Sequence, residues 1–581
     1  MEYFDVEADG LLDSATRAWC MVIISDGEES KYVGDEVLTG VKRLVKSLKS
    51  GKSIIAHNAL GYDVPLIKKL YGIDLDNVGG DGMVLDSLVL SRLVYPNLKE
   101  LDFGSLQRKP NFPKNLIGSH SLQAWGERIG LNKGDHKEFD QYSEEMLEYC
   151  VNDVRLLVKL VEEQLAGKTD PSAVWLEHEF ARIMLKQEEH GFLFNRRAAE
   201  DLHVELLKKQ YDLEEKAKEA FPPKQIQLKT KVKTVPFNPG SRKQIAEGFI
   251  DKYQWEPREF TPDGRPRIDE AVLRSMDYPE AKVLLDFLLV QKRISQLATG
   301  TQAWMKHLKE DGRLHGRVNP IGCVTGRCSH SKPNMAQVPA SYSPYGKECR
   351  SLFTVPKGYK LVGADASGLE LRCLAHYLHR FDNGKYVKQL LEGDIHTENA
   401  KAAGLDKYED GRSRAKTMIY CFLYGGGPEK LGAIVGGGRD AGLKLRNRFL
   451  KKTPALKQLR DAVQAKVKAT GQLKGLDGRV LPIRHSHAAL NTLLQSAGAV
   501  IVKMATVLLH QACEQEGLRW GIDYANVAHI HDEIQLEVKE DYAKLVGELA
   551  VQAIREAGKR LDCLCPLDAE YHVGDTWAET H

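Results

Sequence analysis

The sequence predicts a multidomain protein that combines α/β and α+β folds, and three observations support this prediction. The chain has 581 residues, more than one ordinary core holds, since domains usually contain about 100–200 residues. Apolar residues make up 42% and charged residues 28% of the chain, which is a globular composition. The pattern of apolar residues also changes twice along the chain. We therefore expect about three to five structural units.

The first block, residues 1–165, is expected to form an α/β domain. Strand-like runs at residues 20–25 and 53–56 alternate with helical periodicity, which is clearest at residues 144–165. Such alternation is typical of a sheet that is covered by helices.

The second and third blocks differ in character. Residues 170–220 and 281–308 show long charged helical patterns on either side of a proline-rich region, so we expect a helical arm. A strand-like run at residues 314–318 then opens a block in which residues 360–364 and 526–538 resemble strands with helices between them. This last block predicts an α+β domain.

One segment carries only positive charges. Residues 220–246 contain no acidic residue, although the whole chain is nearly neutral, with a formal charge of +2. A basic run of this kind binds phosphates by releasing counterions, and a solvated loop is the alternative. The basic residues of this segment are Lys224, Lys229, Lys231, Lys233, Arg242 and Lys243.

The composition favours an intracellular, soluble protein. The N-terminus carries Glu2, Asp5 and Glu7 and lacks the basic and apolar parts of a signal peptide. We expect no apolar run that spans a bilayer. The ten cysteines lack zinc-site spacing, which favours free thiols in a reducing compartment.

Acidic residues of the first block form a candidate metal site. Asp5 and Glu7 are two apart in a strand-like segment, so both side chains point to one face and can share a divalent ion. Asp63 and Asp153 complete a four-carboxylate set, and Tyr149 shares a helix face with Asp153. Four carboxylates around two hard cations suit phosphodiester hydrolysis, with Tyr149 orienting the water. Any one of these acids alone is far more often an ordinary surface residue, so only the whole set indicates a metal site.

A second pair of acids lies far apart in the third block. Asp365 follows an apolar run and precedes a helical pattern, so it lies where a strand meets a helix. Asp532 lies in His531-Asp532-Glu533, at the polar tip of an expected hairpin. Only folding can bring these two aspartates together.

A stripe of polar side chains between these acids suits a nucleoside triphosphate. Arg412, Lys416, Tyr420 and Tyr424 recur every four residues, on one face of a helix. The first three span roughly 12 Å at about 1.5 Å per residue, the length of a bound triphosphate. Arg412 and Lys416 then hold the β- and γ-phosphates, and Tyr420 lies against sugar and base. A solvated cationic face is the alternative for the two basic residues.

Glycine runs at residues 425–427 and 436–438 lack the following Lys-Ser/Thr of a phosphate-binding loop, so they favour turns.

The first constellation resembles the exonuclease family that is named for its Asp-Glu-Asp-Asp-Tyr set. This resemblance implies an RNase H-like fold and 3′-to-5′ exonuclease activity for the N-terminal domain. All five positions are present, as Asp5, Glu7, Asp63, Asp153 and Tyr149.

The second constellation resembles the three polymerase motifs of family A (Pol I-type) DNA polymerases. Its carriers are Asp365 with the following Ser-Gly-Leu-Glu-Leu-Arg, the Arg412–Tyr420 helix and His531-Asp532-Glu533. Within that family the chain is similar to the replicative polymerases of T-seven-like podoviruses, over nearly its whole length. Matching stretches are residues 86–93, 118–126, 319–327, 343–350, 393–397, 475–479 and 487–498.

The resemblance implies a right-hand polymerase, and with it the domain limits. We expect the exonuclease domain at residues 1–165, a helical thumb and connector at 166–312, fingers at 396–480 and a palm in two parts, 313–395 and 481–581. The implied function is template-directed DNA synthesis with proofreading by a two-metal-ion mechanism.

The resemblance also implies roles for single residues. Asp365, the carbonyl of Ala366 and Asp532 would bind two Mg²⁺ ions, as Asp5, Glu7 and Asp153 would in the exonuclease site. The other implied roles are incoming-nucleotide binding by His396, Arg412, Lys416 and Tyr420, exclusion of the 2′-hydroxyl by Glu370, support of the primer end by Glu533, and DNA contacts by Arg327, Gln495, His531, Lys229, Lys231 and Lys233.

Two departures from the family pattern affect the implied partners. Cys421 stands where the family usually has glycine after the helix tyrosine. The podovirus polymerases carry a long thumb insertion that binds thioredoxin, whereas only residues 224–235 separate the arm from Asn238-Pro239-Gly240-Ser241, which resembles the thumb motif. We therefore expect no thioredoxin binding.

The expected partners are primer-template DNA, deoxynucleoside triphosphates and a replicative helicase-primase, with no membrane. A cytoplasmic monomer is expected, in the host cytoplasm if the gene is viral.

Two other functions share parts of these patterns. A single-subunit RNA polymerase shares the palm, but Glu370 and the exonuclease set argue against it. A DNA-binding accessory protein with inactive sites would need losses among the metal ligands, and the sequence shows none.

Overall fold

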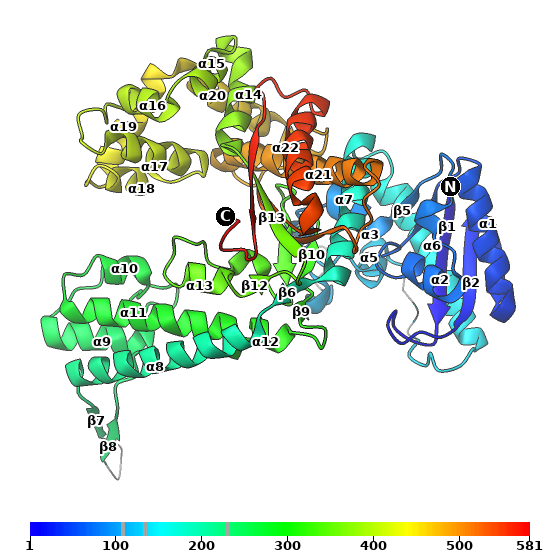
Figure 1. Ribbon diagram of the computed structural model, residues 1–581, viewed down its shortest axis with the longest axis horizontal. Coiled ribbons are helices and arrows are strands. Elements are labelled where there is room, and N and C mark those ends of the chain that lie inside the picture. Colours follow the sequence, from blue (N-terminus) through cyan, green and yellow to red (C-terminus); the bar gives the residue numbers. More distant parts are fainter. Residues whose placement is uncertain (106–110, 132–133, 135, 228–231, 581) are drawn as a thin grey trace. The chain divides into compact units, whose positions relative to one another are not determined.

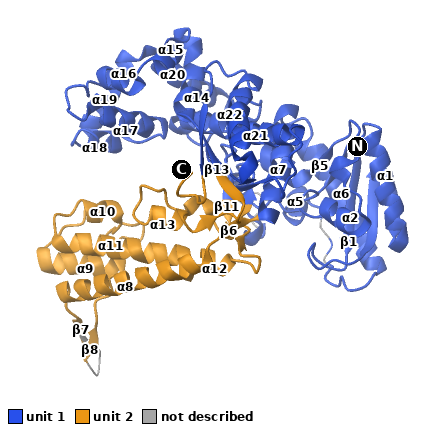
Figure 2. Ribbon diagram, in the orientation of Figure 1, with its two compact units in different colours: residues 1–190, 318–329, 362–573 blue, residues 191–317, 330–361, 574–581 orange. Residues whose placement is uncertain are grey.

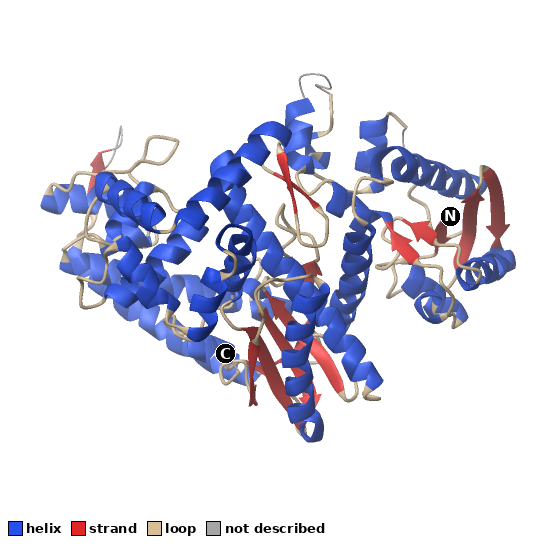
Figure 3. Cartoon of the chain, turned by 90° about the horizontal axis from the view of Figure 1, so that it is seen from above, coloured by secondary structure: helices blue, strands red, loops and turns tan. Residues whose placement is uncertain are grey.

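The computed structural model describes residues 1–105, 111–131, 134, 136–227 and 232–580, and the chain forms two compact units. Unit 1 comprises residues 1–190, 318–329 and 362–573, and unit 2 comprises residues 191–317, 330–361 and 574–581 (Figure 2). Helices predominate in both units, as the colouring in Figure 3 shows.

The N-terminal part of unit 1 is built on a five-stranded mixed sheet. Its strand order is β3-β2-β1-β4-β5, with β1 antiparallel to β2 and parallel to β4. In the central strand β1 only Asp5 and Glu7 are half-exposed, on one face, and the other five residues are buried. The strands are β1 (Glu2–Ala8), β2 (Ala18–Ser25), β3 (Glu28–Val33), β4 (Ile54–Ala56) and β5 (Val84–Asp86).

Helices cover this sheet and complete the α/β domain that the sequence predicts (Figure 1). One apolar cluster includes Phe4 and residues of α1, and a second includes Tyr3 and residues of α6. The helices of this part are α1 (Val37–Lys49), α2 (Asp63–Tyr71), α3 (Ser87–Val94), α4 (Leu98–Ser105), α5 (Leu122–Ile129) and α6 (Glu144–Lys159).

The rest of unit 1 is centred on a second sheet. The strand order is β16-β17-β13-β18, and β16 and β17 form an antiparallel hairpin. Helices α7 (Pro171–His190) and α21 (Ala489–Gln515) contribute to one large apolar core with strands of this sheet. The strands are β13 (Tyr359–Ala366), β16 (Tyr524–Ile530), β17 (Glu533–Lys539) and β18 (Ala569–Gly574), and α14 (Leu369–Asp382) and α22 (Ala543–Arg560) complete the layer.

A group of shorter helices lies between β13 and α21 along the chain, and it shares the same apolar core. Its members are α15 (Lys385–Glu392), α16 (Ile395–Ala403), α17 (Gly411–Leu423), α18 (Pro428–Ala433), α19 (Arg439–Lys452) and α20 (Pro454–Thr470), followed by the hairpin of β14 (Gln472–Lys474) and β15 (Val480–Pro482).

Unit 2 contains the helical arm. Phe221, Phe237 and Phe249 form its aromatic core, with Phe221 stacked on Phe237 at 4.7 Å between ring centroids. The helices are α8 (Arg196–Ala220), α9 (Arg242–Tyr253), α10 (Glu270–Arg274), α11 (Pro279–Ile294), α12 (Trp304–His307) and α13 (Gly346–Arg350). The strands are β6 (Phe192–Phe194), β9 (Arg313–Leu314) and β12 (Phe353–Thr354), in the order β12-β6-β9, and the hairpin of β7 (Lys224–Gln227) and β8 (Val232–Val235). A last two-stranded sheet consists of β10 (Arg317–Asn319) and β11 (Ser329–Ser331).

Two sequence predictions need correction. The helix expected at residues 281–308 is interrupted, because α11 passes into a π-helical turn, Ser295–Thr299, and Gly300 then takes an extended conformation. The second concerns membranes: one helix, Ser486–Gln515, is long and apolar enough to cross a bilayer, with a mean hydropathy of 1.6. That window is 89% buried within the fold, because the helix packs against apolar neighbours on several sides, so it matches a core helix.

Candidate active sites

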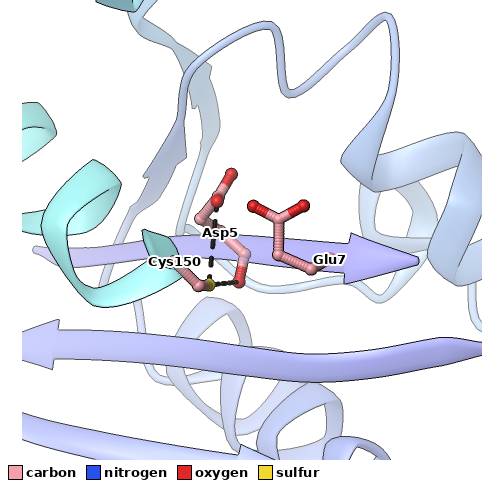
Figure 4. A group of neighbouring side chains, drawn as sticks. All are labelled: Asp5, Glu7 and Cys150. Atoms are coloured by element: carbon pink, nitrogen blue, oxygen red, sulfur yellow. Dashed lines mark hydrogen bonds between the residues drawn. The ribbon is translucent and has the colours of Figure 1, made fainter. Parts of the chain in front are cut away.

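The structure places Asp5 and Glu7 side by side on β1, as the period of a strand requires (Figure 4). Their carboxylate oxygens and Sγ of Cys150 all lie within 4.8 Å of one another. Two carboxylates this close repel each other unless a cation lies between them. The strand thus presents a ready pair of oxygen ligands for a hard divalent ion.

Cys150 is a member of this site that the sequence did not reveal. Its thiol, on α6, lies 3.6 Å from the backbone oxygen of Asp5 and 3.7 Å from the Asp5 carboxylate. Burial, followed by a neighbouring thiol and the negative charge of Asp5, raises the pKa of Cys150 well above its usual value. The thiol therefore stays protonated and donates toward Asp5. The Tyr149–Asp153 spacing could have drawn attention to it, since Cys150 lies between them.

Asp63 supplies a buried carboxylate beside the same pair. It begins α2, and its Oδ1 is buried with no hydrogen-bond partner in the described part of the chain. Burial, then the negative charges of Asp5 and Asp86, raise the pKa of Asp63 well above the usual range for a carboxyl group. An unsatisfied buried carboxyl oxygen next to a second carboxylate fits a divalent cation.

The remaining two predicted residues, Tyr149 and Asp153, lie on α6, the helix that also carries Cys150. Asp153 is buried and lies one turn beyond Cys150, the residue that contacts Asp5. Tyr149 is half-buried, and its ring lies 5.9 Å from the ring of His136 and 6.3 Å from that of Phe139. The aromatic neighbours restrict the tyrosine ring, while Asp63 and Asp153 lie outside the tight group of Asp5, Glu7 and Cys150.

Asp86 supports the loop that precedes Asp63, another role that the sequence did not reveal. Its buried carboxylate accepts hydrogen bonds from the backbone N–H groups of Asn58 at 2.9 Å, Leu60 at 3.2 Å and Leu88 at 2.8 Å. Its own N–H donates to Nε2 of His178 on α7, at 2.9 Å. Asp86 therefore holds the loop through Asn58 and Leu60, and His178 in turn holds Asp86.

The second candidate site joins Asp365 and Asp532. Asp365 is exposed near the end of β13, and Asp532 lies in the turn between β16 and β17. The N–H of Ala366 donates to the backbone oxygen of Asp532 at 3.3 Å, so the two acidic residues occupy adjacent backbone positions of one sheet. His531 makes the turn with a positive φ of 57°.

Charged side chains surround Asp532. A small cavity is lined by Arg327, Leu369, Glu370, Leu494, Gly498, Ala499, His531 and Asp532. Burial, then the nearby Glu370, raises the pKa of Asp532, whereas burial and then Arg327 lower the pKa of His531. A carboxylate destabilised by another carboxylate again fits a cation site.

The predicted polar stripe is present on α17, and α16 lies beside it. Nε of Arg412 donates to Oδ2 of Asp394 at 2.7 Å, and this ion pair holds the pKa of Asp394 far below its usual range. Asp394 also caps α16, accepting from the N–H of His396. The His396 ring lies 6.4 Å from that of Tyr420, and burial, then Arg412 and Lys416, lower the pKa of His396.

Tyr424 connects this stripe to Glu370. Its hydroxyl donates to Oε1 of Glu370 at 2.6 Å, and its ring is stacked on Tyr420 with centroids 6.5 Å apart. Burial, then the bond to Glu370, raise the pKa of Tyr424 to about 12. The sequence placed Tyr424 on the stripe without a role, and the structure provides one.

The predicted DNA contacts are dispersed. Lys233 is exposed on β8, while Lys229 and Lys231 lie outside the described residues. The remainder of the basic run is partly neutralised, since Lys224 pairs with Asp251 at 2.5 Å. Gln495, on α21, donates to the side chain of Asn491 at 2.8 Å.

The segment that resembles the thumb motif caps α9. Oγ of Ser241 accepts the N–H of Gln244 at 3.3 Å, and the Gln244 side chain in turn accepts the N–H of Asn238 at 2.7 Å. This reciprocal cap fixes the start of the helix. At the other departure from the family pattern, Cys421 is half-buried, and its backbone oxygen accepts the N–H of Gly426 at 2.7 Å.

Comparisons with known proteins agree on the family. The sequence pattern described as DNA polymerase family A matches residues 203–579, and that of the RNase H superfamily matches residues 2–165. The chain is 36% identical to the DNA-directed DNA polymerases of Enterobacteria phage T3 and Escherichia phage T7, each over a 707-residue alignment that covers 99% of both chains. It is 26% identical to DNA polymerase I of Aquifex aeolicus, covering 98% of this chain and 95% of that protein.

A solved structure has the same fold. The polymerase domain of Pol1 from M. smegmatis, in complex with a DNA primer-template and dNTP, superposes with a TM-score of 0.76 at 19% identity, covering 99% of this chain and 96% of that one.

Proposed function

The chain belongs to DNA polymerase family A, as a DNA-directed DNA polymerase with an RNase H-like domain, and we propose that it also proofreads, removing mismatched primer ends 3′ to 5′. The observation that carries this proposal is the presence of two separate acidic sites, one on β1 and one where β13 meets the β16–β17 turn. Polymerases of this family use metal ions.

In the polymerase site, Asp365, Asp532 and the carbonyl of Ala366 would hold two Mg²⁺ ions. These ions, when bound, lower the pKa of the primer 3′-hydroxyl and neutralise charge on the leaving pyrophosphate. Glu533, buried at the start of β17, supports the primer end from below the turn.

The fingers helix α17 binds the triphosphate. Arg412 and Lys416 neutralise the β- and γ-phosphates, His396 donates from α16, and Tyr420 lies against the sugar and base. Glu370 occupies the space that a 2′-hydroxyl needs, and its bond to Tyr424 fixes its direction. Discrimination against ribonucleotides follows from this fixed carboxylate.

The RNase H-like domain holds the exonuclease site. Asp5, Glu7 and Asp153 would bind two Mg²⁺ ions, together with Asp63, whose buried Oδ1 has no hydrogen-bond partner among the described residues. Tyr149 orients the attacking water by a hydrogen bond from its hydroxyl.

Primer-template DNA is the proposed macromolecular ligand, as in the Pol1 complex of the same fold. Arg327, Gln495 and His531 would contact the duplex near the primer end, and Lys229, Lys231 and Lys233 would contact its phosphates. We further propose a cytoplasmic monomer that acts with a helicase-primase.

The thumb is proposed to lack a thioredoxin site. Only a short stretch around residues 224–235 stands in the thumb between α8 and the segment that resembles the thumb motif. The 707-residue alignments with the phage polymerases exceed this chain's 581 residues, so the phage proteins carry segments that this chain lacks. Added thioredoxin should leave product length unchanged in a single-binding primer-extension assay, and longer products would contradict the proposal.

Reciprocal substitutions test the two sites. Asp365→Ala should abolish primer extension in Mg²⁺ and leave degradation of single-stranded DNA intact. The double variant Asp5→Ala with Glu7→Ala should do the reverse, and mismatched primers should then persist. Extension by Asp365→Ala, or unchanged degradation by the double variant, would refute the corresponding site.

A further inference from the structure

Four charged side chains form a buried cluster beside the polymerase site. Glu177 is 0% exposed, Lys503 1%, Arg479 2% and Asp477 6%. Burying charges is costly unless they are paired with good geometry. Removing any one of these two acids and two bases would therefore leave a buried charge without its partner. We name these four residues the buried charge cluster.

The cluster joins three separate segments of unit 1. Glu177 on α7 accepts two hydrogen bonds from Nζ of Lys503 on α21, at 2.7 and 2.8 Å. It also accepts one from Arg479, in the loop of the β14–β15 hairpin, at 2.6 Å. Asp477 binds Arg479 from the other side, at 2.6 to 3.0 Å. Glu177 thus fixes both bases at once.

Both bases also contact the segment that carries Arg327. Nζ of Lys503 donates to the backbone oxygen of Pro320 at 2.9 Å. Arg479 lies over Gly326, since a side-chain carbon at position 326 would collide with its Nη1. Nη1 of Arg479 is buried and has no hydrogen-bond partner among the described residues. Its position is therefore set by packing against Gly326.

The segment itself is a tight loop. The N–H of Gly326 donates to the oxygen of Cys323, and that of Gly322 donates to the oxygen of Arg327, both at 2.9 Å. Gly326 has a positive φ of 78°, a conformation that side chains disfavour. The loop ends on Arg327, which lines the cavity with Asp532 and Glu370.

We propose that Glu177, acting through Arg479 and Lys503, positions Arg327 in the polymerase site. The inference rests on the proposed role of Arg327 at the primer end. Glu177 is a positioning residue, since its hydrogen bonds to Arg479 and Lys503 act on Arg327 only through those two side chains. Its helix, α7, also carries His178, the neighbour of the exonuclease loop, so one helix supports both sites.

The test is a double-mutant cycle between Glu177→Gln and Arg327→Ala, measured by single-turnover primer extension in Mg²⁺. The amide keeps the shape of Glu177 and removes its charge, leaving one acid for two buried bases. We expect Glu177→Gln to slow extension about tenfold in the wild-type background and at most about twofold in the Arg327→Ala background, because both changes then act on one group.

A matched control separates positioning from general destabilisation. Asp102→Asn breaks another buried ion pair, in which Arg128 donates to Asp102 at 2.9 and 2.8 Å, within the N-terminal α/β domain. It should leave extension within about twofold of wild type. A control loss as large as that of Glu177→Gln would overturn the proposal.

Two further outcomes are decisive. If Glu177→Gln slows extension equally in both backgrounds, the positioning role of Glu177 is wrong and the role of Arg327 stands. If Arg327→Ala extends primers at the wild-type rate, the proposed role of Arg327 is wrong, and this inference fails with it. If Glu177→Gln does not fold, as judged by loss of its exonuclease activity, Arg479→Lys replaces it. A lysine at position 479 keeps the positive charge, but it cannot bind both Glu177 and Asp477 and also cover Gly326. We therefore expect Arg479→Lys to slow extension in the wild-type background and to have little effect in the Arg327→Ala background.

Discussion

The two acidic sites are assembled in different ways. The proposed exonuclease ligands come from the first 153 residues, and two of them lie on a single strand, where the thiol of Cys150 lies 3.7 Å from the Asp5 carboxylate. The polymerase site joins Asp365 to Asp532, which are distant in sequence, through one backbone hydrogen bond and an exposed nucleotide stripe. The first site therefore groups two half-exposed carboxylates on one strand, whereas the second pairs an exposed aspartate with an aspartate of a distant hairpin turn.

The largest expected effects test whether the sites are independent. Asp63→Asn should lower exonuclease activity by about 10³-fold, and Asp532→Asn should lower polymerisation by a similar factor, because each amide removes a charge that holds a cation. The measurement is both activities of each variant in Mg²⁺. If either variant loses both activities, the two sites are not independent. As a control, removing Mg²⁺ from the wild-type protein with a chelator should abolish both activities.

A pH experiment tests the burial of His178, which accepts the N–H of Asp86 next to the loop that precedes Asp63. Burial lowers the pKa of His178 from 6.5 to about 4, so the folded protein keeps it neutral. As pH falls below 6.5 the unfolded chain binds a proton that the folded chain does not, and stability decreases, by about 2 kcal/mol between pH 7 and pH 5.

His178→Gln should reduce this decrease, since glutamine can still accept from Asp86 and donate to Val174 without titrating. Urea unfolding at pH 7 and pH 5 measures it. Exposed His572→Gln is the control, and an identical pH dependence in His178→Gln and wild type would show that His178 does not titrate as inferred.

A smaller effect, on nucleotide binding, is expected at the ion pair that Asp394 forms with Arg412 of α17. Asp394 engages Nε of Arg412 and leaves the terminal nitrogens for phosphate, so Asp394→Asn should raise KM for the nucleotide about fivefold with little change in kcat. Asp410→Asn breaks a similar exposed pair, with Arg414 at 2.6 Å on the same helix, and should change neither constant. A fall in KM for Asp394→Asn would mean that Asp394 competes with the triphosphate.

The smallest effect concerns sugar selection. Tyr424→Phe removes the hydroxyl that fixes Glu370, and we expect ribonucleotide incorporation to rise about threefold. Glu370→Ala should raise it further, since it clears the space entirely. Competition between one deoxynucleotide and its ribonucleotide on a primed template measures both, and a Tyr424→Phe variant as selective as wild type would leave Glu370 fixed by packing alone.

Some features of the sites could be read from the sequence because they are local. Strand period places Asp5 and Glu7 on one face, and helix period places Arg412, Lys416, Tyr420 and Tyr424 on one stripe; the structure shows both. The helix at residues 281–308 could not be read correctly, because its π-helical end depends on packing and not on composition.

Other features depend on contacts between distant segments. Cys150 beside Asp5, Asp86 beneath the Asp63 loop and Tyr424 against Glu370 join residues 26 to 145 positions apart. No spacing rule links such positions, because the intervening chain can take many paths.

The sequence alone indicated the Asp5–Glu7 pair and the polar stripe of α17, because each rests on residue types at a short, regular spacing, and its motifs indicated the family. Only the tertiary structure shows that Asp365 lies next to Asp532 and that Glu177 binds Arg479, which packs on the loop of Arg327. These residues are far apart in the sequence, and buried charges such as Glu177 and Arg479 need partners of opposite sign, which only folding brings to them.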